Sequence, residues 1–206
     1  MGRCLFMRKG EIHTIPLALP TGYTKLEYIQ SSGKQWIDTG FKPNQDTRVV
    51  MNCYVISFNS CDMFLFGARV SAGNAAFYIA ADDTNTKWFI SYGNDVQNPV
   101  GTCTGHHSID MNKNSVSIDD AITTLSASTF QSASNLLLFA TNTAGSTDSQ
   151  RGTMNLYSCQ IYDNGTLVRD YVPCINASGE AGLYDLVGKQ FYGNAGTGVF
   201  TGSEVA

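Results

Sequence analysis

The sequence predicts an all-β protein, a two-sheet antiparallel β-sandwich, and three observations carry this prediction. The first is Asn164-Gly165 between two strand-like runs, because an Asn-Gly pair supplies the positive φ angles of a type I′ hairpin turn. The second is the recurrence of short apolar-aromatic runs separated by Gly, Asn, Asp and Ser. The third is that no window has the periodicity of an amphipathic helix, although 120–125 has the composition of a turn.

The Asn-Gly turn also predicts a strand register. Its expected pairs are Asp163 with Thr166, Tyr162 with Leu167, Ile161 with Val168, and Gln160 with Arg169. This register places Asp170 on the apolar face, opposite Cys159. Either Asp170 has a buried partner, or a β-bulge moves it outward.

Strand candidates follow one another at short intervals along the chain. They are 25–29, 35–38, 47–58, 63–70, 75–81, 87–92, 106–111, 115–118, 135–140, 153–163, 166–172, 182–186 and 190–192. Many short strands with turn signals between them are typical of a sandwich or barrel. Pro16 and Pro20 with Gly22 discourage regular structure in the first 22 residues, so we expect an N-terminal arm over 1–22 and one domain over 23–206.

The composition argues against a nucleic-acid partner and against membrane insertion. Charged residues make up 15% of the 206 positions, against ~25% in a typical soluble domain. The net charge is −4 and the 13 basic residues are scattered, which argues against a nucleic-acid partner. No apolar run approaches ~18 residues, so we expect no membrane insertion.

The N-terminal segment and the cysteines bear on the compartment. Arg8, Lys9 and Glu11 interrupt the apolar stretch that a signal peptide needs, so we expect no signal peptide. The protein is then expected in the cytoplasm or in a virus particle assembled there. The six cysteines lack CxxC spacing, which favours buried free thiols over zinc ligands or disulfides.

Three stretches together resemble a known domain type. They are LEYIQSSGKQWIDTGF (26–41), LLLFATN (136–142) and the run from IYDNGTLVRDYVPC (161–174) through GLYDLVGKQFYGNAGTGVF (182–200). In this order they resemble the laminin-G-like, concanavalin A-like jelly-roll domains of phage and prophage tail and other virion structural proteins. The resemblance covers roughly 23–200, nearly the whole chain.

The resemblance implies that the matching positions are framework rather than site. These positions are Trp36, Asp38, Thr39, Gly40, Arg169, Asp170, Pro173, Cys174, Gly182, Tyr184, Asp185, Phe191, Tyr192 and Asn194. In a jelly roll the first and last strands lie near each other. The expected contact is between Trp36–Gly40 and Tyr184–Asn194.

Relatives of this fold include glycoside hydrolases, which need two carboxylates flanking the scissile bond. The chain has four glutamates, Glu11, Glu27, Glu180 and Glu204, and no E-x-D-x-E array. Asp82-Asp83 and Asp119-Asp120 are adjacent, so in a strand each pair would point to opposite faces. His106-His107 lacks a G-x-S-x-G nucleophile elbow. We therefore expect no enzyme, with aspartates converging across a sheet as the open alternative.

Resident cofactors are not expected, and calcium is the best metal hypothesis. Laminin-G-like and lectin-like sandwiches often hold Ca²⁺ with loop oxygens. The candidates are Asp82, Asp83, Asn85, Asp95, Asp119 and Asp120. Solvated turn carboxylates are the alternative.

Sugar binding needs exposed aromatic faces with neighbouring amides or carboxylates. Strand alternation in 87–92 places Trp88, Ile90 and Tyr92 on one face and Phe89 on the other. If the Phe89 face is the core, an open platform results. The predicted ligand-binding residues are then Tyr78, Asp82, Asp83, Trp88, Tyr92 and Asn94. The alternative places Trp88 and Ile90 in the core.

These expectations combine into one functional hypothesis. The protein is predicted to be a non-enzymatic phage virion surface protein, in the tail or as a head decoration, with a lectin-like domain. Its expected partners are a glycan or bacterial cell surface, other virion proteins and further copies of itself. The alternatives are a decoration or cement protein that binds no sugar, and a glycoside hydrolase of the same fold.

Overall fold

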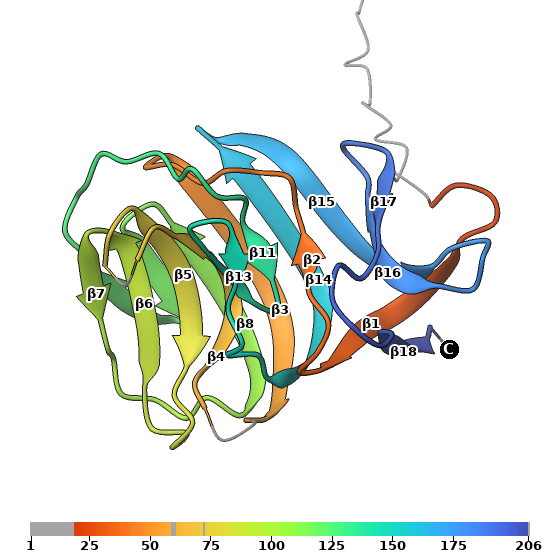
Figure 1. Ribbon diagram of the computed structural model, residues 1–206, viewed down its shortest axis with the longest axis horizontal. Helices are drawn as coiled ribbons and strands as arrows, with labels where there is room; N and C mark the ends of the chain where they lie inside the picture. Colours follow the sequence, from red (N-terminus) through yellow and green to blue (C-terminus); the bar gives the residue numbers. More distant parts are fainter. Residues whose placement is uncertain (1–18, 59–60, 72, 206) are drawn as a thin grey trace, which may run out of the picture.

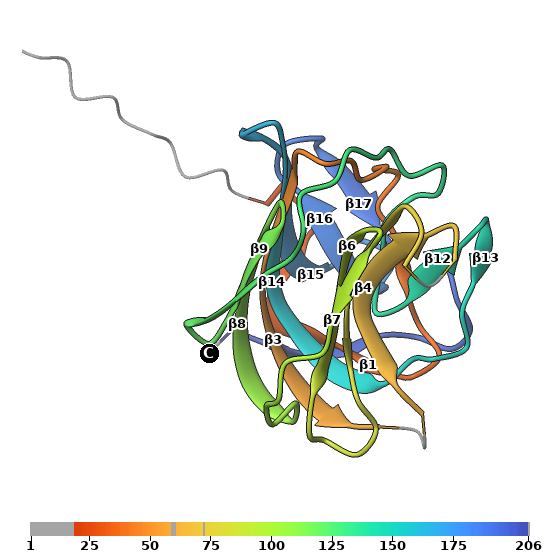
Figure 2. The same ribbon diagram turned by 90° about the vertical axis from the view of Figure 1, so that its left-hand side faces the viewer.

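The computed structural model describes residues 19–58, 61–71 and 73–205, and these residues form two sheets without a helix (Figure 1). The sheets stack as two layers (Figure 2). Every strand pair is antiparallel except β12 with β4. The predicted all-β class with two antiparallel sheets is confirmed. No helix of the described part is long and apolar enough to cross a membrane.

Ten strands form the larger sheet, which we call sheet A. In spatial order they are β10 (Ala121–Thr124), β9 (Ser115–Ile118), β8 (Gly105–Asn112), β3 (Thr47–Ser57), β14 (Thr153–Asp163), β1 (Thr24–Ser32), β15 (Thr166–Ile175), β16 (Ala181–Asp185) and β17 (Gln190–Tyr192), with β18 (Thr201–Glu204) paired to β1. The segment expected as a turn over 120–125 is therefore strand β10.

Eight strands form sheet B. In spatial order they are β13 (Ser146–Thr147), β12 (Thr141–Thr143), β4 (Met63–Arg69), β5 (Ala76–Ala81), β6 (Trp88–Gly93) and β7 (Asp95–Gln97), with β11 (Leu137–Leu138) joining β4 to β2 (Ile37–Asp38). The candidates at 35–38 and 135–140 thus shorten to two residues each.

The core fills the space between the two sheets. In β3 the side chains alternate, so that Val49, Met51, Cys53 and Val55 face inward and are essentially inaccessible. Strand β5 is buried on both faces: Phe77 and its neighbours at alternate positions join the main core, while Ala76, Tyr78 and Ala80 form a second cluster with Phe64. In these two strands, period-two alternation therefore assigns each side chain to the core or to an outer face.

The predicted hairpin exists, with one correction to its register. Asn164 and Gly165 both have positive φ, and the pairs Asp163–Thr166 and Tyr162–Leu167 are confirmed. Beyond them Val168 is an extra residue in β15. The predicted pairs Ile161–Val168 and Gln160–Arg169 are therefore wrong, because a register shift pairs Ile161 with Arg169 and Gln160 with Asp170.

Of the two alternatives for Asp170, a buried partner or a bulge, the structure has the bulge. The Asp170 carboxylate lies beside Gln160, whose Nε2 donates a hydrogen bond of 3.0 Å to it. Tyr171 then takes the buried position opposite Cys159. The bulge moves a charge out of the core and an aromatic ring into it, which hydrophobic burial favours.

The two ends of the domain meet, as the resemblance implied. Strand β1 pairs with β14 near its end and with β15 at its start, and β18 pairs with β1. The backbone N–H of Trp36 donates to Oδ1 of Asn194 at 3.3 Å, and Ala195 donates to the carbonyl of Trp36 at 2.9 Å. The expected contact between these segments is confirmed at Trp36 and Asn194.

The prediction of buried free thiols is confirmed at four of the five described cysteines. Cys53, Cys103, Cys159 and Cys174 are buried and free, and Cys61 is free and partly exposed. Burial raises the pKa of the Cys53 thiol to about 12. Cys4 and most of the predicted arm, residues 1–18, lie outside the described residues.

Asp185 is the most completely buried carboxylate of this framework, which generates a prediction about stability. Its Oδ1 accepts the backbone N–H groups of Asp170 at 2.9 Å and Val187 at 3.0 Å. Its Oδ2 lies 3.6 Å from Nε of Arg169. Removing the carboxylate leaves these two backbone N–H groups without their acceptor and takes away the neighbouring negative charge from Arg169.

We expect Asp185→Ala to lower the free energy of unfolding by about 3 kcal/mol, measured by urea denaturation. Asp120→Asn is the control, because it removes the charge of an exposed turn carboxylate and keeps a residue type that tolerates the positive φ of this position; it is expected to change the free energy of unfolding by less than about 0.5 kcal/mol. Equal stability of the two variants would contradict the structural role assigned to Asp185.

Candidate functional site

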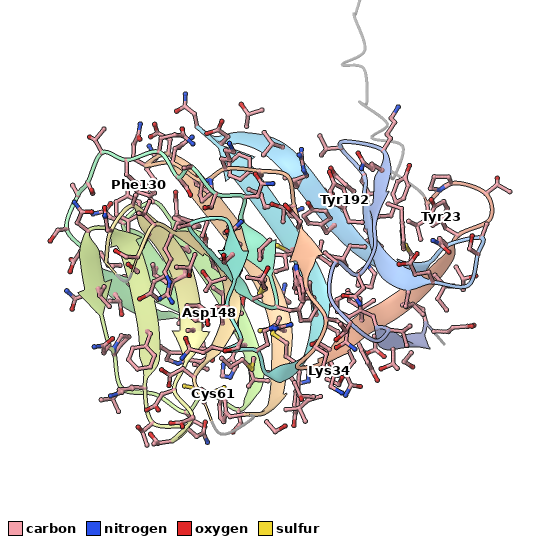
Figure 3. The ribbon with its side chains drawn as sticks, viewed as in Figure 1. Tyr23, Lys34, Cys61, Phe130, Asp148 and Tyr192 are labelled. Atoms are coloured by element: carbon pink, nitrogen blue, oxygen red, sulfur yellow. The ribbon has the colours of Figure 1, made fainter. Side chains whose placement is uncertain are left out.

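Trp88 and Tyr92 do not form the expected open platform. Both are 3% exposed and face the main core, and Phe89 points to the outer face of sheet B. Trp88 packs edge-on against His107, and Tyr92 packs against Phe130, which is labelled in Figure 3. The assignment of the Phe89 face to the core was wrong, because the stripe with the larger apolar area is the buried one.

Tyr78 does lie on the outer face of sheet B, but it is covered. Its ring packs edge-on against Phe64, with the centroids 5.2 Å apart. The guanidinium carbon of Arg69 lies 4.9 Å from the Phe64 centroid and 5.6 Å from that of Tyr78. Asp148 (Figure 3) holds this guanidinium through a 2.8 Å ion pair. With Tyr78 only 5% exposed, this face presents no open ring for a sugar.

The three predicted polar residues do not converge. Asp82 and Asp83 follow the end of β5, whereas Asn94 follows β6 and accepts a hydrogen bond from the backbone of Ala75 at the other end of the hairpin. The β5–β6 register places Ala81 opposite Trp88 and Ala76 opposite Gly93, which separates the two ends by the full strand length.

Asp82 and Asp83 instead form an acidic group with Asp62, which the sequence did not predict. Ligand atoms of the three carboxylates lie within 4.8 Å of one another. Both aspartates sit in a turn rather than a strand, so the expectation that they point to opposite faces does not apply. Asp82 is already engaged, because its oxygens accept from the backbone and hydroxyl of Thr84 and from the hydroxyl of Thr86.

The other calcium candidates lie elsewhere and have their own local contacts. Oδ1 of Asn85 accepts the backbone N–H groups of Cys103 and Thr104. Asp95 accepts the N–H of Ser126, and Asp119 contacts His107. Asp119 and Asp120 form the β9–β10 turn with positive φ angles. The six candidates therefore do not form one calcium-binding loop.

An exposed aromatic surface that the sequence did not reveal lies on the outer face of sheet A. It consists of Tyr28 on β1, Tyr157 on β14, Tyr54 on β3 and His106 on β8, and we call these residues the aromatic row. Ring centroids are 5.5 Å apart for Tyr28–Tyr157, 5.4 Å for Tyr157–His106 and 4.8 Å for His106–Tyr54. The row thus crosses four neighbouring strands without a break.

Local sequence explains how each ring reaches this face. Tyr54 lies between the buried residues Cys53 and Val55, so it points outward, and His106 is its cross-strand partner. Tyr157 is the extra residue of a bulge between β14 and β3. Tyr54 is 36% exposed, and Tyr28 and Tyr157 are half-buried. Strand alternation alone could have placed Tyr54 outward, but its neighbours depend on the strand order.

Neutral polar groups accompany the aromatic row. Nδ2 of Asn52 donates to the hydroxyl of Ser158 at 3.1 Å. Asn155 lies opposite Tyr54 on one side and Gln30 on the other. Its Oδ1 is buried and, among the described residues, has no hydrogen-bond partner. An unpaired buried acceptor is costly, so a ligand or solvent donor there would be stabilising.

A pocket of about 400 Å³ opens beside the aromatic row, where β1 enters between β14 and β15. Its lining residues are Lys25, Leu26, Glu27, Tyr157, Ser158, Asp170, Tyr171, Val172, Pro173, Leu186 and Val205. Tyr157 therefore belongs both to the row and to the pocket wall. Chemically, the surface combines stacking faces with hydroxyl, amide and carboxylate groups.

Two comparisons with known proteins assign no family to this chain. No protein-family model matches the chain, and a search of curated proteins finds no match either.

The Asp82 turn generates a prediction about pH. The hydrogen bonds from Thr84 and Thr86 lower the pKa of Asp82 from 3.8 to about 2. A lowered folded-state pKa contributes stability above the unfolded-state value, and that stability disappears as the pH falls. The contribution is therefore present above about pH 4 and lost between pH 4 and 2.

We expect the melting temperature of the unsubstituted protein to exceed that of Asp82→Asn at pH 5 and the difference to shrink toward pH 2. Asp120→Asn, in an exposed turn, serves as the control and should show no such convergence. A difference between unsubstituted protein and Asp82→Asn that does not vary from pH 5 to pH 2 would contradict the assigned hydrogen bonds.

Proposed function

We propose that this protein is a non-enzymatic carbohydrate-binding β-sandwich that uses the aromatic row as its sugar-binding surface. The observation that carries the proposal is the row itself, four contiguous rings on a solvent-facing sheet. Pyranose rings have an apolar C–H face that packs on aromatic side chains. Their hydroxyls need amide, hydroxyl or carboxylate partners at the edge of such a platform.

The polar surroundings favour a neutral glycan over an acidic one. Asn52, Ser158 and Asn155 lie on the same face, and all three are uncharged. The adjoining pocket is lined by two carboxylates, Glu27 and Asp170, and one cation, Lys25. This excess of negative charge would repel a uronic or sialic acid and suits the hydroxyls of a neutral sugar.

The setting we propose is a virion surface, on the strength of the resemblance to phage tail and virion proteins. A glycan-binding domain there would attach the particle to a bacterial cell wall or capsule. A single open platform binds weakly, because its ligand stays largely solvated. Several copies on one particle would raise the overall avidity by orders of magnitude.

Binding to a bacterial glycan array, with the protein displayed in many copies, tests the proposal. We expect Tyr157→Ala to weaken binding at least tenfold, because it removes the central ring, worth about 1.4 kcal/mol. Tyr23→Ala is the matched control, since Tyr23 is also half-buried but packs on Tyr184 and Phe191. It should bind normally.

Three results would overturn the proposal. Unchanged binding by Tyr157→Ala would remove the aromatic row as the site. Absence of binding to any glycan would favour the decoration or cement role. Release of new reducing ends, abolished by Glu27→Gln or Asp170→Asn, would identify a glycoside hydrolase with its carboxylates in the adjoining pocket.

A further inference from the structure

A second pocket lies at the side of the sandwich, formed by residues other than those of the aromatic row. It has a volume of about 350 Å³ and lies between the segment 99–104 and the β9–β10 hairpin. We call it the edge pocket. Its lining residues are Trp88, Pro99, Val100, Gly101, Thr102, Thr104, His107, Ile118, Asp119, Ala121 and Thr123. Trp88 comes from sheet B, whereas His107 and Ile118 come from sheet A.

A fixed histidine forms part of the pocket lining. Nδ1 of His107 lies 2.7 Å from Oδ2 of Asp119, and Nε2 lies 3.0 Å from the carbonyl oxygen of Cys103. The second oxygen of Asp119 accepts the backbone N–H of Ser108. Both ring nitrogens therefore already have partners, and the imidazole packs edge-on against Trp88 at 4.9 Å. This arrangement makes the histidine a support for the indole rather than a ligand-binding group.

The indole N–H of Trp88 is the donor that the structure leaves open. Trp88 is 3% exposed, and within the described part of the chain its Nε1 has no hydrogen-bond partner. A Cβ added at Gly101 would lie 3.1 Å from this nitrogen. The absence of a side chain at Gly101 thus keeps the N–H accessible from the pocket. A ligand acceptor placed there would pair this donor in place of solvent.

The other lining residues of the edge pocket indicate which chemical groups a ligand needs beside its acceptor. Pro99, Val100, Ile118 and Ala121 supply apolar surface, and Val100 is 91% exposed at the mouth. The residues described as lining this pocket include no lysine or arginine, its histidine is engaged by Asp119, and the half-exposed Asp119 carboxylate would repel an anion. The matching ligand is neutral, with a small apolar group beside one strong acceptor. An acetamido group has this composition, a methyl next to a carbonyl oxygen.

We propose that the edge pocket binds the acetamido group of an N-acetylated sugar. Its carbonyl oxygen accepts the Trp88 indole N–H, and its methyl packs against the apolar wall of Val100 and Ile118. This site is separate from the aromatic row, and neither site needs the other to be occupied.

The two tryptophans of the chain, Trp36 and Trp88, allow a direct test. In a Trp36→Phe background Trp88 is the only indole, and its fluorescence reports on the edge pocket. Titration with N-acetylglucosamine should give a saturable change in Trp88 emission. Glucose, which lacks the acetamido group, should bind at least tenfold more weakly. No saturable change, or an equal response to both sugars, would overturn the proposal.

Two variants in this background locate the binding. Gly101→Ala covers the indole nitrogen and should weaken N-acetylglucosamine binding at least fivefold. Ala121→Leu fills the pocket from the other wall and should do the same, so it decides the matter if Gly101→Ala melts early. Ala177→Leu, at an exposed loop position, is the matched control and should bind normally. Unchanged binding by a folded Ala121→Leu would contradict the site.

Tyr157→Ala separates this proposal from the preceding one. In the Trp36→Phe background it should leave the Trp88 titration unchanged while losing binding at the aromatic row. If Tyr157→Ala abolishes the Trp88 response as well, the edge pocket is not an independent site.

Discussion

Sheet B packs against the inner face of sheet A, and this contact determines which side chains of both sheets are buried and which reach solvent. In β3, burial of Cys53 and Val55 against the opposite sheet forces Tyr54 outward. The same contact surface takes up Trp88 and Tyr92 from β6, which removes them from solvent. Core packing thus decides indirectly which aromatic rings remain available for a ligand.

Two bulges adjust this pattern where strict alternation would fail. The extra residue Val168 lets Tyr171 enter the core and moves Asp170 beside Gln160. The bulge at Tyr157 adds a ring to the outer face without displacing the buried Leu156. One bulge lies on β15, at Val168, and the other on β14, at Tyr157. Tyr157 and Asp170 line the pocket next to the aromatic row. Irregular pairing here shapes the surface that we propose to be functional.

The sequence predicted what depends on local chemistry and missed what depends on strand order. The Asn164-Gly165 hairpin was predicted because its turn residues determine its geometry. The predicted register of this hairpin was wrong from Val168 onward. The bulge there depends on the packing of Tyr171 in the core, which the local sequence does not reveal. The orientation of Trp88 was ambiguous, since alternation gives two equivalent choices until the opposing sheet is known. The aromatic row unites residues from 28 to 157, and only the order β1-β14-β3-β8 brings them together.

Whether sugar binds on the outer face of sheet A can be measured by an NMR titration that follows the aromatic side-chain signals while a glycan identified on the array is added. We expect the largest shifts at Tyr28, Tyr54, His106 and Tyr157, on the outer face of sheet A. Shifts concentrated instead at Tyr78 and Phe89, on the outer face of sheet B, would contradict this expectation.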